Sequence, residues 1–119
     1  MKTIQNIAAQ GDLIVRRVRV LPKDVVDQKV QGDIIVAHSE TGHHHVAQVS
    51  SGGAVALMAR PNDQLRSYLR VDSGSYVDFV HQRPFDTHET LRMLCNPGDV
   101  LEIRRQREWT PEGWRRVED

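Results

Sequence analysis

Short hydrophobic runs, each closed by glycine, proline, aspartate or asparagine, are the dominant pattern along this chain, and helical periodicity is scarce. Residues 13–20 end in an alternation of Val and Arg, which is typical of a strand with one solvated face. Residues 34–38 are rich in β-branched side chains and follow a Gly-Asp pair, which indicates a buried strand. The same reasoning predicts further strands at residues 43–49, 54–59, 67–71, 75–81, 100–109 and 114–117.

The segment Asn96-Pro97-Gly98-Asp99 is the clearest turn signal, because proline at the second position and glycine at the third suit a type II turn. In the strand expected after it, Leu101 and Ile103 fall on one face, whereas Glu102 and Arg104 fall on the other. About seven to nine short strands with this density of turns predict an all-β fold, either a small barrel or a sandwich. No repeat or linker divides the chain, so residues 1–119 are expected to form a single β domain.

Composition narrows the classes of function. Sixteen basic residues balance 16 acidic ones among 119, which disfavours a nucleic-acid partner. No apolar run is long enough for a membrane span, and the first residues lack a signal-peptide core, so we expect no membrane partner and a cytoplasmic site of synthesis. The single cysteine, Cys95, excludes an internal disulfide and is expected to be a buried structural thiol.

The histidines form the densest chemical signal. One is at residue 38, three are consecutive at residues 43–45, and two more follow at residues 81 and 88. Alternate residues of a strand share a face, so His43 and His45 can point together while His44 points away. With a third ligand from another strand they would form an open site for a divalent transition metal such as zinc, iron, manganese or nickel. The favoured ligands are His43, His45 and His88, followed by His38, with His81 and His44 ranked below them. The alternatives are a polar structural role and direct proton transfer.

A second chemical signal is the density of arginine and tryptophan in residues 104–109 and 114–116. Arginine and tryptophan bind polyanions and are enriched at protein interfaces, and the candidate residues for such a role are Arg105, Arg107, Trp109 and Trp114. The alternative is a charged strand whose arginines pair with nearby glutamates, and the zero net charge favours it over nucleic-acid binding.

Several segments together resemble a family of small uncharacterised proteins found in bacterial and bacteriophage genomes. The resemblance rests on an opening Gly-Asp-hydrophobic strand, a central G-H-x-H at residues 42–45 and a closing R-Q-R-E-W at residues 105–109. It implies no particular activity. A partial likeness to the cupins, in His43-x-His45 and the Pro97-Gly98 turn, implies a jelly-roll or cupin-like barrel with a histidine-bound metal. The glutamate that cupins carry soon after the histidine pair is missing here.

These observations favour a non-enzymatic structural protein that assembles as a homo-oligomer. A small β domain of balanced charge suits assembly into symmetric oligomers. The leading expectation is a bacteriophage virion component, such as a capsid-associated cement or decoration protein, whose partners are capsid or other virion proteins. A cupin-like metal-dependent enzyme is the first alternative, and a nucleic-acid-binding accessory protein is the second.

Overall fold

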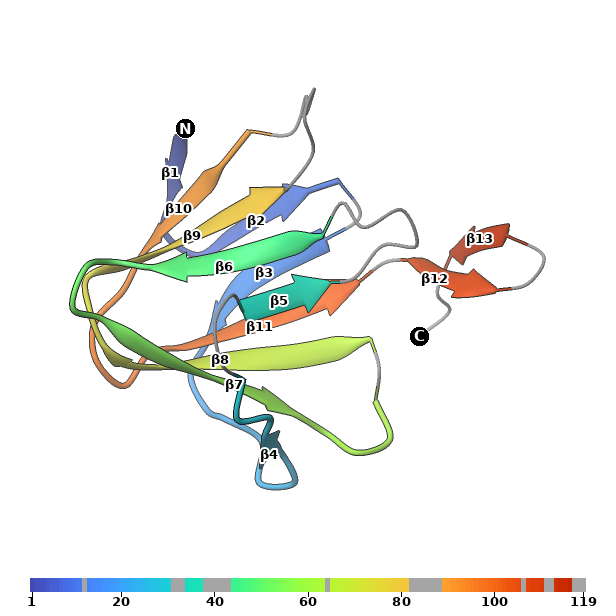
Figure 1. Ribbon diagram of the computed structural model, residues 1–119, viewed down its shortest axis with the longest axis horizontal. Coiled ribbons are helices and arrows are strands. Elements are labelled where there is room, and N and C mark those ends of the chain that lie inside the picture. Colours follow the sequence, from blue (N-terminus) through green and yellow to red (C-terminus); the bar gives the residue numbers. More distant parts are fainter. Residues whose placement is uncertain are drawn as a thin grey trace.

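Two β-sheets form the body of the molecule, and the described residues contain no helix (Figure 1). The computed structural model describes residues 1–11, 13–30, 34–37, 44–63, 65–81, 89–105, 107–110 and 113–116, with backbone alone at 37, 107–110 and 113–116. Sheet A has the order β1 (Lys2–Ile4), β10 (Leu91–Leu94), β9 (Tyr76–His81), β6 (His45–Val49), β5 (Ile34–Ala37). Sheet B has the order β2 (Ile7–Gln10), β3 (Leu13–Val18), β11 (Val100–Arg105), β8 (Arg66–Ser73), β7 (Ala54–Ala59), β4 (Val26–Asp27).

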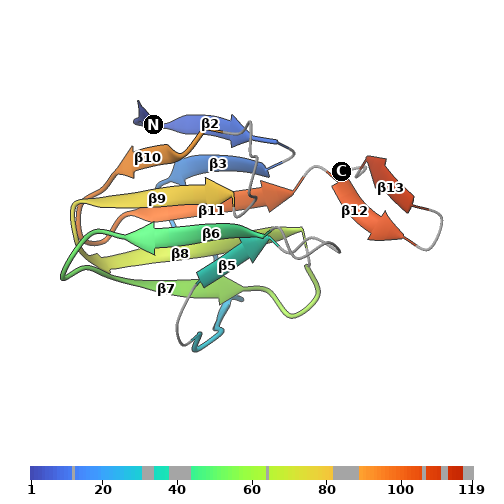
Figure 2. The same cartoon turned by 45° about the horizontal axis from the view of Figure 1, so that its top comes forward.

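Distant parts of the chain meet in both sheets. In sheet B the late strand β11 lies between β3 and β8, antiparallel to both, with Ile103 opposite Val15 on one side and Ser67 on the other. In sheet A the first strand, β1, runs parallel to β10, whereas the other pairings in that sheet are antiparallel. Figure 2 shows the two sheets stacked face to face, so the fold is a sandwich and not a closed barrel.

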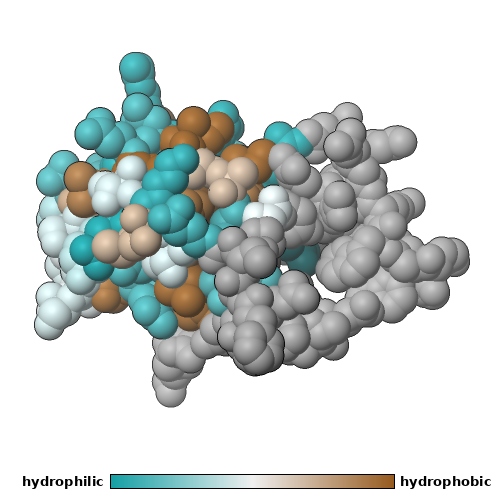
Figure 3. Space-filling view, turned by 90° about the horizontal axis from the view of Figure 1, so that it is seen from above, coloured by the Kyte–Doolittle hydropathy of each residue, from teal (hydrophilic) through white to brown (hydrophobic). Residues whose placement is uncertain are grey.

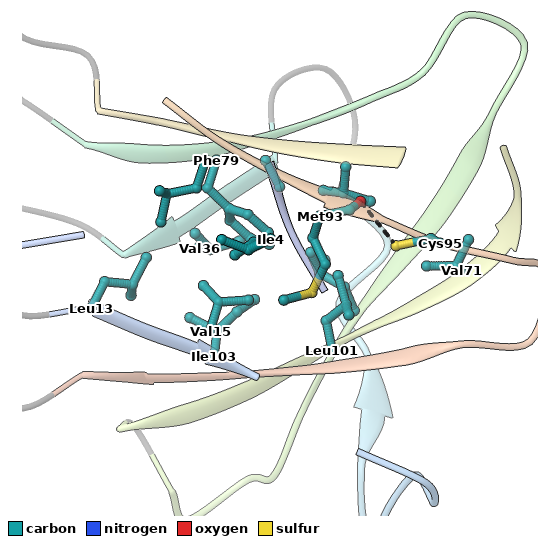
Figure 4. Packing of buried hydrophobic residues seen from close by; sticks show 14 residues of the cluster. Ile4, Leu13, Val15, Val36, Val71, Phe79, Met93, Cys95, Leu101 and Ile103 are labelled. Carbon is teal, nitrogen blue, oxygen red and sulfur yellow. Dashed lines mark hydrogen bonds between the residues drawn. The ribbon is translucent and has the colours of Figure 1, made fainter. Parts of the chain in front are cut away.

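The main core lies between the sheets and follows from the alternation of each strand. Phe79, Leu13, Leu101 and Met93 are completely buried, and they come from strands of both sheets (Figure 4). Burying a side chain of this size contributes about 1.5–3 kcal/mol, and a dozen such residues provide the main stabilisation of the sandwich.

A second, smaller cluster covers part of the outer face of sheet B. Met58, Tyr68 and Val100 are buried there, and Leu21 and Val25 from the connection between β3 and β4 pack against them. This connection therefore closes one region of a face that would otherwise be solvated.

The predicted turn at Asn96–Asp99 is present between β10 and β11. The amide of Asp99 donates to the carbonyl of Asn96 at 3.0 Å, and Gly98 has a φ of 94°. A positive φ at the third turn position is the requirement that only glycine meets without strain.

The all-β fold expected from the sequence is confirmed, and of the two predicted forms, barrel and sandwich, the structure is a sandwich. The described residues hold more strands than the expected seven to nine. Eleven strands make up the two sheets, and β12 (Arg107–Thr110) pairs with β13 (Gly113–Arg116) in a separate hairpin. The long strand expected at residues 100–109 is therefore described as β11 and β12, on either side of residue 106. Among the described residues there is no helix with the length and hydrophobicity that crossing a membrane requires.

Candidate functional site

His45 occupies a buried position at the start of β6, where three strands of sheet A meet. Its backbone is opposite Ala37 of β5 and His81 of β9, and the residue is 7% exposed. The imidazole rings of His45 and His81 are stacked, with centroids 4.3 Å apart and planes inclined by 6°. Cross-strand pairing thus brings together two histidines that are 36 residues apart in the sequence.

Gln10, at the end of β2 in the opposite sheet, reaches across the core to His45. Its amide nitrogen Nε2 donates to the carbonyl oxygens of Phe79 and Glu89, both at 2.9 Å. Its oxygen Oε1 lies 2.8 Å from Nδ1 of His45. At 2% exposure, Gln10 is one of the few buried polar side chains among the described residues. It is bonded to β9, to the first residue of β6 and to the segment just before β10.

This network assigns the protonation of His45. Two carbonyl oxygens can only accept, so both amide hydrogens of Gln10 point toward Phe79 and Glu89, and Oε1 faces the histidine as an acceptor. Nδ1 of His45 therefore carries a proton, and in the neutral ring Nε2 carries the lone pair. A histidine whose second ring nitrogen donates to a fixed oxygen is the usual arrangement for a metal ligand.

The stacked pair itself is not arranged to hold one ion. The lone pairs of an imidazole lie in its ring plane, and two planes inclined by 6° do not converge on a common point. His45 and His81 would bind the same metal only after one ring rotated. Within the part of the chain that the structure describes, no group of three or more His, Cys, Asp and Glu residues is placed to hold a metal ion.

Three of the four predicted ligands, His38, His43 and His88, lie outside the described residues. Of the lower-ranked histidines, His81 is described in the stack with His45, and His44 is half-buried beside it in the sequence. Of the four favoured ligands, His45 is therefore the one that lies within the described residues. The structure adds Gln10, its hydrogen-bond partner, which no pattern in the sequence singled out.

The predicted arginine and tryptophan positions lie on β11 and in the separate hairpin. Arg105 ends β11, where its side chain is half-buried and its amide donates to the carbonyl of Leu65 at 2.9 Å. Arg107 and Trp109 belong to β12, and the register places Trp109 opposite Trp114 of β13. Among the described strands, β12 and β13 pair only with each other.

Two further groups of titratable residues have structural roles. Cys95 is buried as expected, and its thiol donates to the carbonyl of Met93 at 3.3 Å. Desolvation is the main cause that raises the pKa of this thiol, so it is a poor nucleophile. On the outer face of sheet B, Glu102 accepts from Arg16 at 2.9 Å and from the Tyr68 hydroxyl at 3.4 Å, and burial is the main cause that raises the pKa of Tyr68.

Comparison with known proteins gives a family but no activity. Residues 9–106 match the model of a family described as a domain of unknown function, DUF8820. No curated protein matches the chain. No solved structure matches it either.

Proposed function

We propose that this chain, which belongs to the DUF8820 domain family, is a non-enzymatic assembly protein that works as a homo-oligomer. Its setting would be a bacteriophage particle, where it would act as a cement or decoration protein on the capsid. The support for this setting is the resemblance of the G-H-x-H and R-Q-R-E-W motifs to a family of small bacterial and bacteriophage proteins.

The observation that carries the proposal is the hairpin β12–β13, which extends beyond the sandwich (Figures 1 and 2). A two-stranded hairpin is only marginally stable in water without a further surface to pack on. This hairpin carries tryptophan at two directly opposed positions, Trp109 and Trp114, and tryptophan is enriched at the energetic centres of protein interfaces. In this proposal the hairpin packs on a neighbouring subunit.

The test compares the oligomeric mass of the 119-residue chain with that of a hairpin variant. Light scattering on a sizing column is expected to give a multiple of 13.6 kDa for the wild type and a smaller multiple for Trp109→Ala/Trp114→Ala. Val20→Ala is the matched control, since Val20 is 74% exposed and lies outside the hairpin. A monomeric wild type would overturn the proposal. Binding of DNA or RNA that weakens steeply with salt would replace it with the nucleic-acid alternative.

The virion setting has its own test. The strain that carries the gene is induced, and its phage particles are purified and analysed by mass spectrometry. The chain is expected in intact particles at a fixed ratio to the major capsid protein. Its absence from particles, with the chain present in the cells that made them, would remove the virion setting and leave the assembly role.

One observation favours a second proposal, a metal site built on His45. Gln10 holds Nδ1 of His45 as a donor, so Nε2 is the nitrogen that has a lone pair in the neutral ring. The other ligands would be the predicted His43, His88 and His38, and the ion a divalent transition metal. Elemental analysis of untagged protein purified without chelator tests this proposal.

About one metal per chain is expected in the wild type, with loss of the metal in His45→Ala and retention in His44→Ala. Gln10→Leu is expected to weaken the metal affinity about 10–100-fold, the usual effect of removing an outer-shell hydrogen bond to a ligand. Metal-free wild-type protein, or equal metal content in the two histidine variants, would contradict the site.

A further inference from the structure

The edge strand β2 borders an open side of the sandwich. It pairs with β3 and with no other described strand, and its residue Ile7 is 62% exposed. A groove of about 430 Å³ runs along it, lined by residues of β1 and β2 together with Gln5, Gly11, Glu89 and Leu91. Figure 3 views the molecule from the side of β1 and shows hydrophobic surface there among hydrophilic residues.

The hydrogen bonding of β2 fixes which of its backbone groups face the open side. The amide of Arg17 donates to the carbonyl of Asn6 at 2.7 Å, so this pair is hydrogen-bonded, and the register then alternates along the strand. Ala8 and Gln10 are therefore hydrogen-bonded to β3, whereas Ile7 and Ala9 direct their N–H and C=O groups away from it.

We propose that β2 pairs antiparallel with β2 of a second copy of this chain, about a two-fold axis at Ala8. In this register Ile7 is opposite Ala9 of the partner subunit, and the two residues exchange both of their outward hydrogen bonds. The symmetry repeats the exchange on the other side of the axis, where Ala9 is opposite Ile7 of the partner subunit. Sheet B then continues from one subunit into the next. This inference rests on the proposed assembly function and names one of its interfaces.

Side-chain faces agree with this register. Ala8 and Gln10 face the core, and Ile7 and Ala9 face outward, so a continuous sheet requires outward residues to oppose outward residues. Pairing Ile7 with the partner's Ala9 meets this requirement and covers the exposed isoleucine. A shift by one residue would set Ile7 against the partner's Gln10 and place a buried polar residue on the wrong face.

Among the described edge strands, β2 is the one best suited to pair with a second copy. Natural edge strands avoid pairing by carrying charges, prolines or bulges, or by being very short. The other described edges carry such features: β1 has Lys2, β4 is two residues long and contains Asp27, and β5 has a register shift between Ile35 and Ala37. The segment from Gln5 to Gly11 contains neither a charge nor a proline. Two copies of it meet without like-charge repulsion.

Two substitutions test the interface without touching the core. Ile7→Lys places a charge from each subunit beside the two-fold axis. Ala9→Pro removes an N–H that faces the open side, and proline is tolerated where an edge-strand N–H faces outward. Each is expected to halve the mass of the wild-type oligomer in light scattering at matched concentration. Val20→Lys, which adds the same charge at an exposed position off the edge, is expected to leave the mass unchanged.

Amide hydrogen exchange provides a second measurement, which reports on β2 directly. The amides of Ile7 and Ala9 are expected to be protected in the oligomer, and Ile7→Lys is expected to remove the protection at Ala9. An oligomer in which these amides exchange freely, or whose mass is unchanged by both substitutions, would refute the β2 interface while leaving the assembly function in place. A monomeric wild type would instead refute the assembly function.

Discussion

Gln10 offers the sharpest test of how the two sheets are held together, and Gln10→Leu is the substitution of choice. Leucine has a similar volume and suits the apolar surroundings, so the change removes hydrogen bonds and creates little empty space. It leaves the carbonyl oxygens of Phe79 and Glu89 and the Nδ1–H of His45 without the partner that they have in the wild type.

The expected loss follows from these three bonds. A typical hydrogen bond contributes about 0.5–1.5 kcal/mol net, so three contribute about 1.5–4.5 kcal/mol to the free energy of unfolding. The bonds to Phe79 and His45 are buried, whereas the bond to Glu89 is partly buried, and water can replace the last of them in part. The apolar contacts of leucine offset some of the loss. We therefore expect a decrease of about 3 kcal/mol.

The assay is equilibrium unfolding in urea, followed by far-ultraviolet circular dichroism, with the slope held common to the variants. Gln48→Leu is the matched control, because Gln48 lies on β6 of the same sheet and is exposed to solvent. The control is expected to change the free energy by less than about 0.5 kcal/mol, as surface substitutions usually do. If Gln10→Leu were as stable as the control, the argument that this side chain joins the sheets would be refuted.

Three further expectations concern the core, the turn and the thiol. Phe79→Ala removes a completely buried ring and is expected to lower the free energy of unfolding in urea by about 3–5 kcal/mol. A decrease no larger than that of a surface variant would contradict the core position of Phe79. Gly98→Ala, at a φ of 94° in open space, is expected to cost about 1–2 kcal/mol through backbone strain alone, and an unchanged midpoint would argue against the turn. Because the pKa of Cys95 is raised in the folded chain, the unfolded chain loses this proton first as pH rises. Stability is therefore expected to fall above the ordinary thiol pKa, and Cys95→Ala should flatten that slope in unfolding measurements at several pH values.

Strands with strong local patterns were predictable from the sequence, and those that depend on their neighbours were not. The β-branched run of β5 and the alternation of β11 indicated strands, and the Pro-Gly pair indicated the turn before β11. Strand β10 has the sequence Leu-Arg-Met-Leu, residues that favour helix in isolation, and it forms between β1 and β9 because its Leu91 and Met93 complete the core.

Within the described part of the candidate site, His45 was singled out by the sequence, and Gln10, which holds its Nδ1, was not. Alternation along a strand pointed to His45, because histidine pairs are visible over a few residues. Gln10 is 35 residues away in the sequence, and a glutamine in a short N-terminal segment has no local mark of burial. Its importance comes from the stacking of the sheets, which brings β2 over the start of β6 and the end of β9. The His45–His81 stack depends in the same way on the register of β6 against β9.

The position of β11 between β3 and β8 has a consequence for synthesis on the ribosome. The chain emerges from its N-terminus, so β3 and β8 are made well before the strand that joins them, and β1 waits similarly for β10. Sheet B has no continuous order until residue 105 has left the exit tunnel. A nascent chain arrested before that point presents β3 with only β2 beside it, and its core lacks Leu101 and Ile103 of β11. The sandwich is therefore completed only after β10 and then β11 have emerged, because β10 joins β1 to the rest of sheet A and β11 joins the two parts of sheet B.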